Sequence, residues 1–159
     1  MSNKALSFLV CLLILIKILS IYFTNFNLFG DEAQYWLWSK ELDFGYFSKP
    51  PFLSWFIAAY TNVIGDSFFS LKILPTLIYF SISLALYSLC RNIGLEKTSS
   101  TSCVLIFLFI PAVSFSSFII STDLFLLFFW TLSLNMVIKI KKAPNTKNFV
   151  LLGIFLGLA

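Results

Sequence analysis

The chain has 159 residues, of which 59% are hydrophobic and 11% are charged, and 20 of them are phenylalanines. Soluble domains carry about 25% charged residues, so this composition excludes an ordinary soluble protein and predicts an integral membrane protein. The net charge of +4 does not indicate nucleic-acid binding, because the basic residues form no stripe interleaved with aromatic ones.

A first membrane span is predicted over residues 5–23. Its length suits a hydrocarbon core of about 30 Å. No small-residue cleavage site follows, so we predict an uncleaved anchor and not a signal peptide. Lys17 lies inside this span, where it either snorkels to the surface or pairs with a buried acid.

A polar loop follows over residues 24–66, with five acids against two lysines. Two short helices are predicted in it. One begins near Asp31 and carries Tyr35, Trp36 and Trp38, aromatic residues suited to the lipid headgroup layer. The other follows Pro51 and, at about 13 residues, is too short to cross a bilayer, so it is predicted to lie in the interface.

Further spans are predicted over 68–90, 103–120 and 123–140, with an incomplete span from 149. The apolar run 103–138 is too long for one crossing, and the polar trio at 121–123 divides it better than a kink at Pro111 does. The final run is 11 residues long and would span about 17 Å, so the chain is predicted to be truncated.

The predicted orientation follows from the positive-inside rule. The N-terminus and most basic residues fall on the side of the membrane that the rule makes cytoplasmic. These basic residues are Lys4, Arg91, Lys97, Lys139, Lys141, Lys142 and Lys147. The 24–66 loop is then extracytoplasmic.

Several kinds of site are excluded by what the sequence lacks. It has no histidine, so it can form neither a Ser-His-Asp triad nor an HExxH zinc site, and it has no Walker loop, GxGxxG or GxSxG. Cys11, Cys90 and Cys103 have no metal-ligand spacing and are interpreted as packing residues. Catalysis would therefore depend on carboxylates, amines and hydroxyls.

The acidic candidates are Asp31, Glu32 and Asp123. Asp31 is either the N-cap of a helix with Gln34 at its third position, or, beside Glu32 near a medium of low dielectric constant, a base toward an incoming hydroxyl or amine. Asp123 is either the cap of the last long helix or a functional acid.

The basic candidate is Lys49, which directly precedes the rigid pair Pro50-Pro51. Prolines would fix its backbone and aim the ammonium at the membrane surface, where it would hold a phosphate. The alternative is an ordinary lysine that snorkels to the surface.

Four segments together resemble the N-terminal part of membrane glycosyltransferases that use polyprenyl-phosphate sugars. The resemblance is to the protein O-mannosyltransferase and aminoarabinose transferase superfamily, the bacterial members in particular. The segments are GDEAQYW (30–36), YFSKPPFLSW (46–55), GDSFFSLKILP (65–75) and PAVSFSSFIISTDLFLLFFWTLSL (111–134).

This resemblance implies an all-α, polytopic helical bundle, here truncated, with juxtamembrane helices in a long first extracytoplasmic loop. Asp31 would be the catalytic aspartate with Glu32 as its motif neighbour, Lys49 would contact the donor phosphate, and Asp123 would be the acid of the second outer loop. The implied partners are the polyprenyl-phosphate sugar donor and membrane lipids, in the bacterial inner membrane.

The sequence also departs from the aminoarabinose transferases. Ser48 stands where an acidic residue helps hold a metal in those enzymes, and no histidine is present, so no metal cofactor is predicted. The implied function is sugar transfer to a lipid, glycan or protein acceptor, without activity in these 159 residues alone. The alternatives are a non-catalytic remnant or accessory subunit, and a small transporter that uses Lys17 and Asp123.

Overall fold

The computed structural model describes residues 3–24, 27–47 and 49–159, apart from the side chains of residues 3, 4, 6 and 7. Over these residues the chain forms helices and no β-strand, as the sequence predicts. An isolated bridge joins Tyr46 and Lys49 in the loop before α3. The helices are α1 (Asn3–Phe23), α2 (Gly30–Trp38), α3 (Phe52–Ile64), α4 (Phe68–Asn92), α5 (Lys97–Phe109), α6 (Pro111–Ser116), α7 (Asp123–Lys142) and α8 (Thr146–Leu158).

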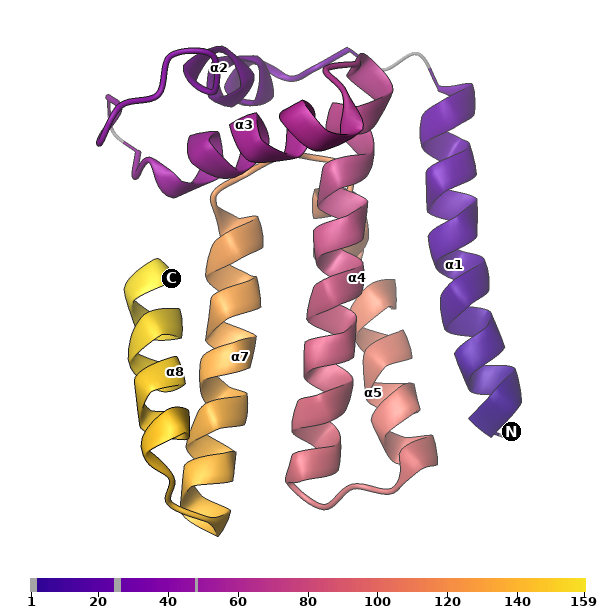
Figure 1. Cartoon of the computed structure of the whole chain (residues 1–159). Coiled ribbons are helices and arrows are strands. Elements are labelled where there is room, and N and C mark those ends of the chain that lie inside the picture. The colour runs from indigo at the N-terminus through magenta and orange to yellow at the C-terminus, as the bar shows by residue number, and fades with distance from the viewer. Residues whose placement is uncertain (1–2, 25–26, 48) are drawn as a thin grey trace.

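The long helices α4 and α7 pack against each other in the middle of the molecule (Figure 1). α8 packs against α7, and both α5 and α1 pack against α4. α2 and α3 lie across one end of this bundle. They are the two short helices predicted in the polar loop, and they cover the end of the bundle where the candidate site residues Asp31 and Lys49 are found.

The ends of the long helices follow from local chemistry. Ser67 caps α4, since its hydroxyl accepts a hydrogen bond from the Ser70 amide at 3.1 Å, which satisfies one of the free amides of the first turn. α7 ends in Lys139, Lys141 and Lys142, whose charges suit the negative end of the helix dipole. Both helices begin where predicted and end two residues later than predicted.

The segment predicted as one span over 103–120 is divided at Pro111. α5 ends at Phe109, and Ile110 has an extended backbone with φ −60° and ψ 122°. A proline ring disfavours the helical conformation of the residue before it, but proline itself fits the first position of a new helix. The break at Pro111 and the break before Asp123 therefore both occur, and a non-helical segment, 117–122, lies between α6 and α7.

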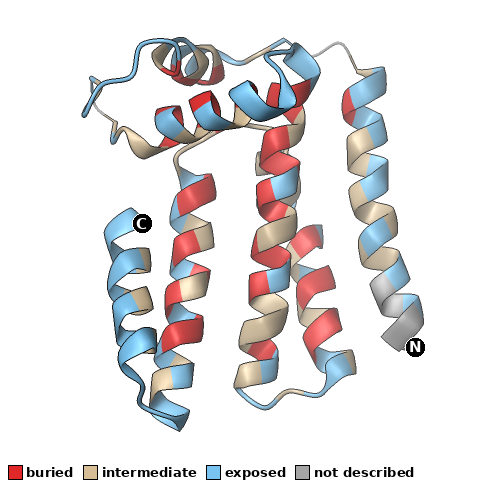
Figure 2. Cartoon of the chain, in the orientation of Figure 1, coloured by how far each residue is buried: buried red, intermediate tan, exposed pale blue. Residues whose placement is uncertain are grey.

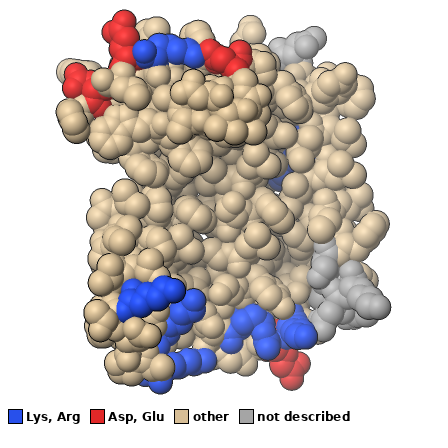
Figure 3. Space-filling view, in the orientation of Figure 1, with Lys and Arg blue, Asp and Glu red and all other residues tan. Residues whose placement is uncertain are grey.

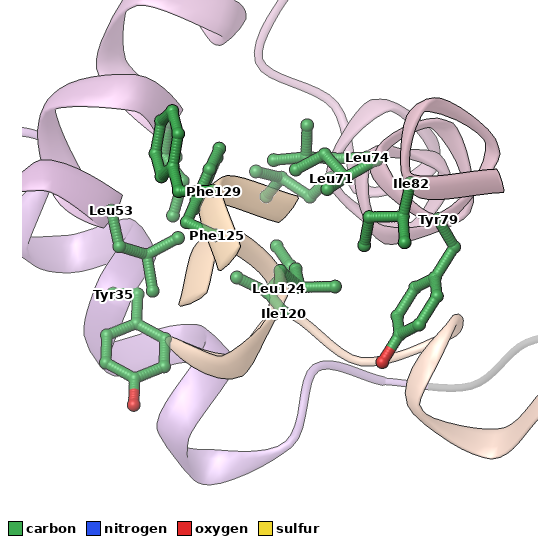
Figure 4. Packing of buried hydrophobic residues seen from close by; sticks show 12 residues of the cluster. Tyr35, Leu53, Leu71, Leu74, Tyr79, Ile82, Ile120, Leu124, Phe125 and Phe129 are labelled. Carbon is green, nitrogen blue, oxygen red and sulfur yellow. The ribbon is translucent and has the colours of Figure 1, made fainter. Parts of the chain in front are cut away.

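The best-packed part of the core lies where α2 and α3 meet the ends of α4 and α7 (Figure 4). Ile57 from α3, Leu124 from α7 and Ile120 from the 117–122 segment are each 0% exposed. Tyr35 of α2 belongs to the same cluster. The polar loop is thus attached to the bundle by apolar packing and not only by its connections to α1 and α4.

Many residues of the outer helices α1 and α8 are exposed (Figure 2), and much of that surface is apolar. Large side chains of α1 and α8 are more than half exposed, among them Phe8, Tyr22, Phe149 and Leu156. In water such surface would be unfavourable, whereas in lipid it is matched by the acyl chains. This distribution is what a helical membrane protein requires.

In the described part of the chain, two helices are long and apolar enough to cross a membrane, Phe68–Asn92 and Asp123–Lys142. The other apolar helices are shorter, and α1 contributes Phe8–Phe23 to this comparison. On the face seen in Figure 3, most acidic groups lie at the end formed by α2 and α3, with a basic group among them, and most basic groups lie at the opposite end, with an acidic group among them. The number of crossings and their orientation stay predictions.

Candidate active site

Asp31 lies in the first turn of α2, and its side chain is exposed. The helix begins at Gly30 and its N-cap is Phe29, two residues earlier than the capping hypothesis requires, so that hypothesis is wrong for Asp31. Glu32 occupies the third helical position instead, and its Oε2 accepts a hydrogen bond from the Phe29 amide at 2.8 Å. Because Glu32 satisfies the free amide, the Asp31 carboxylate does not have to serve as the cap.

Glu32 has no exposed surface, although it directly follows an exposed aspartate. Its Oε2 lies 2.5 Å from the ammonium of Lys72 on α4, which is 4% exposed. Its Oε1 accepts a hydrogen bond from the Ile120 amide at 2.8 Å. A buried charge is tolerated only when it is paired and hydrogen-bonded, and both oxygens of Glu32 meet this condition.

Lys72 was missed as a candidate in the sequence analysis, although it lies within the GDSFFSLKILP segment. The signal that could have found it is a lysine about one turn into an otherwise apolar helix, since charged residues at such positions are costly and usually functional or paired. Its ammonium also lies 5.0 Å from the centre of the Phe29 ring, a distance suited to a cation–π contact.

Lys17 neither snorkels to the surface nor pairs with a buried acid, the two arrangements that the sequence left open. Its ammonium donates to the Ser114 carbonyl at 3.0 Å and to the Ser117 hydroxyl at 2.7 Å, and it lies over the Phe118 ring. These acceptors belong to the end of α6 and the start of the 117–122 segment. Lys17 therefore ties α1 to that segment through neutral oxygens.

Lys49 is half-buried and borders a cavity of about 330 Å³ between the loop, α3, α7 and α8. Its backbone pairs with that of Tyr46, with Lys49 donating at 3.2 Å. Phe52 and Phe125 line the apolar side of the cavity, and Thr122 lies at its wall. A cation at the edge of an apolar hollow suits a ligand that has both a phosphate and a hydrocarbon part. Ser48 lies outside the described residues.

Asp123 is the first residue of α7 and is exposed. No side-chain cap bond is formed at this helix end, but a carboxylate in the first turn is favoured by the helix dipole. Its neighbour Thr122 borders the cavity that Lys49 borders. The structure therefore brings Lys49 close to the chain that carries Asp123, whereas Asp31 does not line this cavity.

The rest of the polar loop is held by aromatic and ionic contacts. Trp38 stacks on Tyr46 with ring centres 4.8 Å apart, and Asp66 accepts a hydrogen bond from the Trp36 indole at 2.8 Å and forms an ion pair with Lys40. The Lys40 hydrogen bond is the main cause of a lowered pKa at Asp66, and the Trp36 hydrogen bond adds to it. These contacts give α2 a fixed place on the bundle.

Comparison with known families settles what kind of protein this is. Residues 48–159 match the family model described as dolichyl-phosphate-mannose-protein mannosyltransferase. The chain belongs to this family. Lys49, Lys72 and Asp123 lie inside the matched range, while Asp31 and Glu32 precede it.

This mannosyltransferase-family chain is similar to an individual protein, the lipid A galacturonosyltransferase RgtD of Rhizobium johnstonii. The two are 34% identical over 145 residues, which make up 90% of this chain and 30% of that protein. The chain thus spans about 30% of the length of this relative. No solved structure matches the chain. The family and this relative together identify a membrane glycosyltransferase sequence.

Among the described residues, no group of three histidine, cysteine, aspartate or glutamate side chains is arranged to hold a metal ion. The groups of the sequence-predicted site that are available for chemistry at this end of the bundle include the Asp31 and Asp123 carboxylates and the Lys49 ammonium. These groups can accept a proton and bind an anion.

Proposed function

We propose that the protein transfers a sugar from a polyprenyl-phosphate donor to an acceptor at the extracytoplasmic face of the bacterial inner membrane. The observation that carries this proposal is the similarity to a lipid A galacturonosyltransferase over 90% of the chain. On this basis a lipid is the acceptor class to test first, with galacturonic acid as the sugar. A glycan or a protein hydroxyl are the other acceptors that the family allows.

In the proposed reaction, the exposed carboxylate of Asp31 takes the proton of the acceptor hydroxyl. The acceptor oxygen then attacks the anomeric carbon of the sugar, and the bond between that carbon and the phosphate oxygen breaks. The polyprenyl phosphate leaves from the face opposite the attacking oxygen, so this single displacement inverts the configuration at the anomeric carbon. A general base of this kind contributes about 10²–10⁴-fold to a rate.

The proposed role of Lys49 is to bind the donor phosphate at the edge of the cavity. Negative charge grows on that phosphate as the bond breaks, so the Lys49 ammonium stabilises the transition state more than the ground state. Phe52 and Phe125 in the cavity wall would contact the first isoprenoid units. Asp123, one residue beyond the wall, would face the acceptor or the sugar hydroxyls.

The test is a transfer assay with the full-length gene product in proteoliposomes, using labelled polyprenyl-phosphate galacturonic acid and lipid A. Replacing Lys49 by glutamine should lower kcat/KM for the donor by about 100-fold, the cost of removing one preorganised group that stabilises developing negative charge. The matched control is Lys40→Gln, which removes a lysine from the same loop but outside the cavity. If both variants keep full activity, Lys49 does not bind the donor phosphate.

A further inference from the structure

The 117–122 segment, which connects α6 to α7, is held in place by side chains from three distant helices. The Ile120 amide donates to Glu32 of α2, the Ser117 carbonyl accepts from the Thr76 hydroxyl of α4 at 2.9 Å, and the Ser117 hydroxyl accepts from Lys17 of α1. A non-helical segment needs such partners because its buried backbone groups are not paired within a helix. Its position therefore depends on these side chains.

Glu32 is the acidic member of this arrangement, and it is also the ion-pair partner of Lys72 on α4. We infer that this buried ion pair is a positioning device for catalysis, which holds the helix that carries Asp31 in register with the segment that forms the donor cavity wall. The inference rests on the proposed function of Asp31 and Lys49. Lys72 would act through Glu32 and would not contact the substrate.

The covalent connections explain why one ion pair would control both parts of the site. Asp31 directly precedes Glu32 in the first turn of α2, so fixing Glu32 fixes the backbone of Asp31. Thr122 follows Ile120 by two residues and borders the cavity at Lys49. Glu32 joins these two parts through its hydrogen bond from the Ile120 amide, and Lys72 holds Glu32. A displacement of about 1 Å between reacting groups can cost about 10²-fold in rate, so this arrangement matters for turnover.

A rival role for Lys72 is direct contact with a lipid phosphate, because it also borders an apolar cavity of about 320 Å³ between α1, α4 and the 115–119 chain. Geometry favours positioning. The Lys72 ammonium already lies against the Glu32 carboxylate at 2.5 Å, and only 4% of the residue is exposed. The two roles predict different kinetics, which makes them separable.

The experiment compares Lys72→Met, Lys72→Arg and the double variant Glu32→Gln/Lys72→Met in the full-length gene product, by the same transfer assay. Lys72→Met leaves an unpaired carboxylate and should lower kcat about 100-fold with little change in KM for the donor. The double variant removes both charges while the glutamine oxygen can still accept one backbone hydrogen bond, so it should regain at least about tenfold of that loss. Lys72→Arg should retain activity, and the control Lys40→Met should be unchanged.

The inference is overturned if the double variant is as inactive as Lys72→Met, or if Lys72→Met raises the donor KM at unchanged kcat, because Lys72 would then contact the substrate. A second readout does not depend on activity. Hydrogen exchange of the peptide that contains Ile120 should be faster in Lys72→Met than in the wild type and unchanged in Lys40→Met. Equal exchange in all three proteins would also overturn it.

Adding Asp31→Asn to these variants separates failure of the inference from failure of the proposed function. If Asp31→Asn keeps full transfer activity, the proposed function of Asp31 is wrong, and with it the catalytic role of the ion pair, even where exchange at Ile120 responds to Lys72→Met. If Asp31→Asn is inactive and the Lys72 variants are normal in rate and exchange, the proposed function stands and only the positioning role is wrong.

Discussion

Replacing Lys72 by methionine should destabilise the folded protein far more than the same replacement of Lys40. Both lysines are paired with a carboxylate, but the side chains of Lys72 and Glu32 are 5% and 0% exposed, whereas those of Lys40 and Asp66 are 38% and 40% exposed. Removing one partner of a buried pair leaves an uncompensated charge and costs about 3–5 kcal/mol. An exposed pair contributes about 0.2–1 kcal/mol.

The two backbone hydrogen bonds to Glu32 remain in Lys72→Met and solvate part of its charge, so the lower end of the range, about 3 kcal/mol, is expected. Methionine keeps most of the lysine volume, and no large cavity is added. For a protein of this size each kcal/mol changes Tm by about 2–4 °C. Lys72→Met should therefore lower Tm by about 6–12 °C, and Lys40→Met by at most about 4 °C.

The assay is thermal unfolding in detergent micelles, followed with a thiol-reactive dye. Cys90 is buried and reports unfolding when it becomes accessible, provided that the exposed Cys11 and the half-buried Cys103 are replaced by serine. The double variant Glu32→Gln/Lys72→Met should recover part of the lost Tm. Equal Tm values for Lys72→Met and Lys40→Met would refute the reasoning, because they would show that burial of the pair does not determine its contribution.

Two further predictions concern packing and pH. Leu124→Ala should lower the free energy of unfolding by about 2–5 kcal/mol, because Leu124 is 0% exposed in the cluster of Figure 4. Leu134→Ala, on the same helix at a residue that is 46% exposed, should change the Tm measured by the dye assay little. Similar losses in the two variants would show that this cluster is not the stable core. Asp66 has a lowered pKa when folded, mainly through the Lys40 hydrogen bond, so its small stabilisation is present above the ordinary carboxyl pKa and is lost as pH falls through the lower folded value. The difference in Tm between wild type and Asp66→Asn should accordingly be larger at pH 6 than at pH 3, and a difference that grows on acidification would contradict the role of Lys40.

The long helices could be predicted from the sequence because their signals are local. Apolar runs bounded by Ser67, by Asp123 and by the lysines of α7 determine where α4 and α7 begin and end. The short helices of the polar loop were predictable for the same reason. The break at Pro111 follows from a rule about one residue and its neighbour, but the rule does not decide between a kink and two helices with a segment between them.

The partners of the charged residues could not be predicted in this way. Glu32 meets Lys72 across 40 positions of the chain and the Ile120 amide across 88, and such pairs depend on how α2 packs on the bundle. The pattern of Asp31 and Glu32 gave no sign that one carboxylate is exposed and the other fully buried. Lys17 shows the same limit, since its acceptors are serine oxygens of α6 and of the segment after it, 97 and 100 positions later.

The most direct test of the whole account is the transfer rate of Asp31→Asn in the full-length gene product, beside Asp43→Asn as an exposed aspartate of the same loop. The account predicts that Asp31→Asn lowers kcat by at least about 100-fold, the contribution of a general base, while binding of the polyprenyl-phosphate donor and Tm stay the same. Asp43→Asn should transfer sugar at the wild-type rate. An Asp31→Asn protein within a few-fold of the wild-type rate would contradict the account, because the exposed carboxylate of α2 would then take no part in the chemistry.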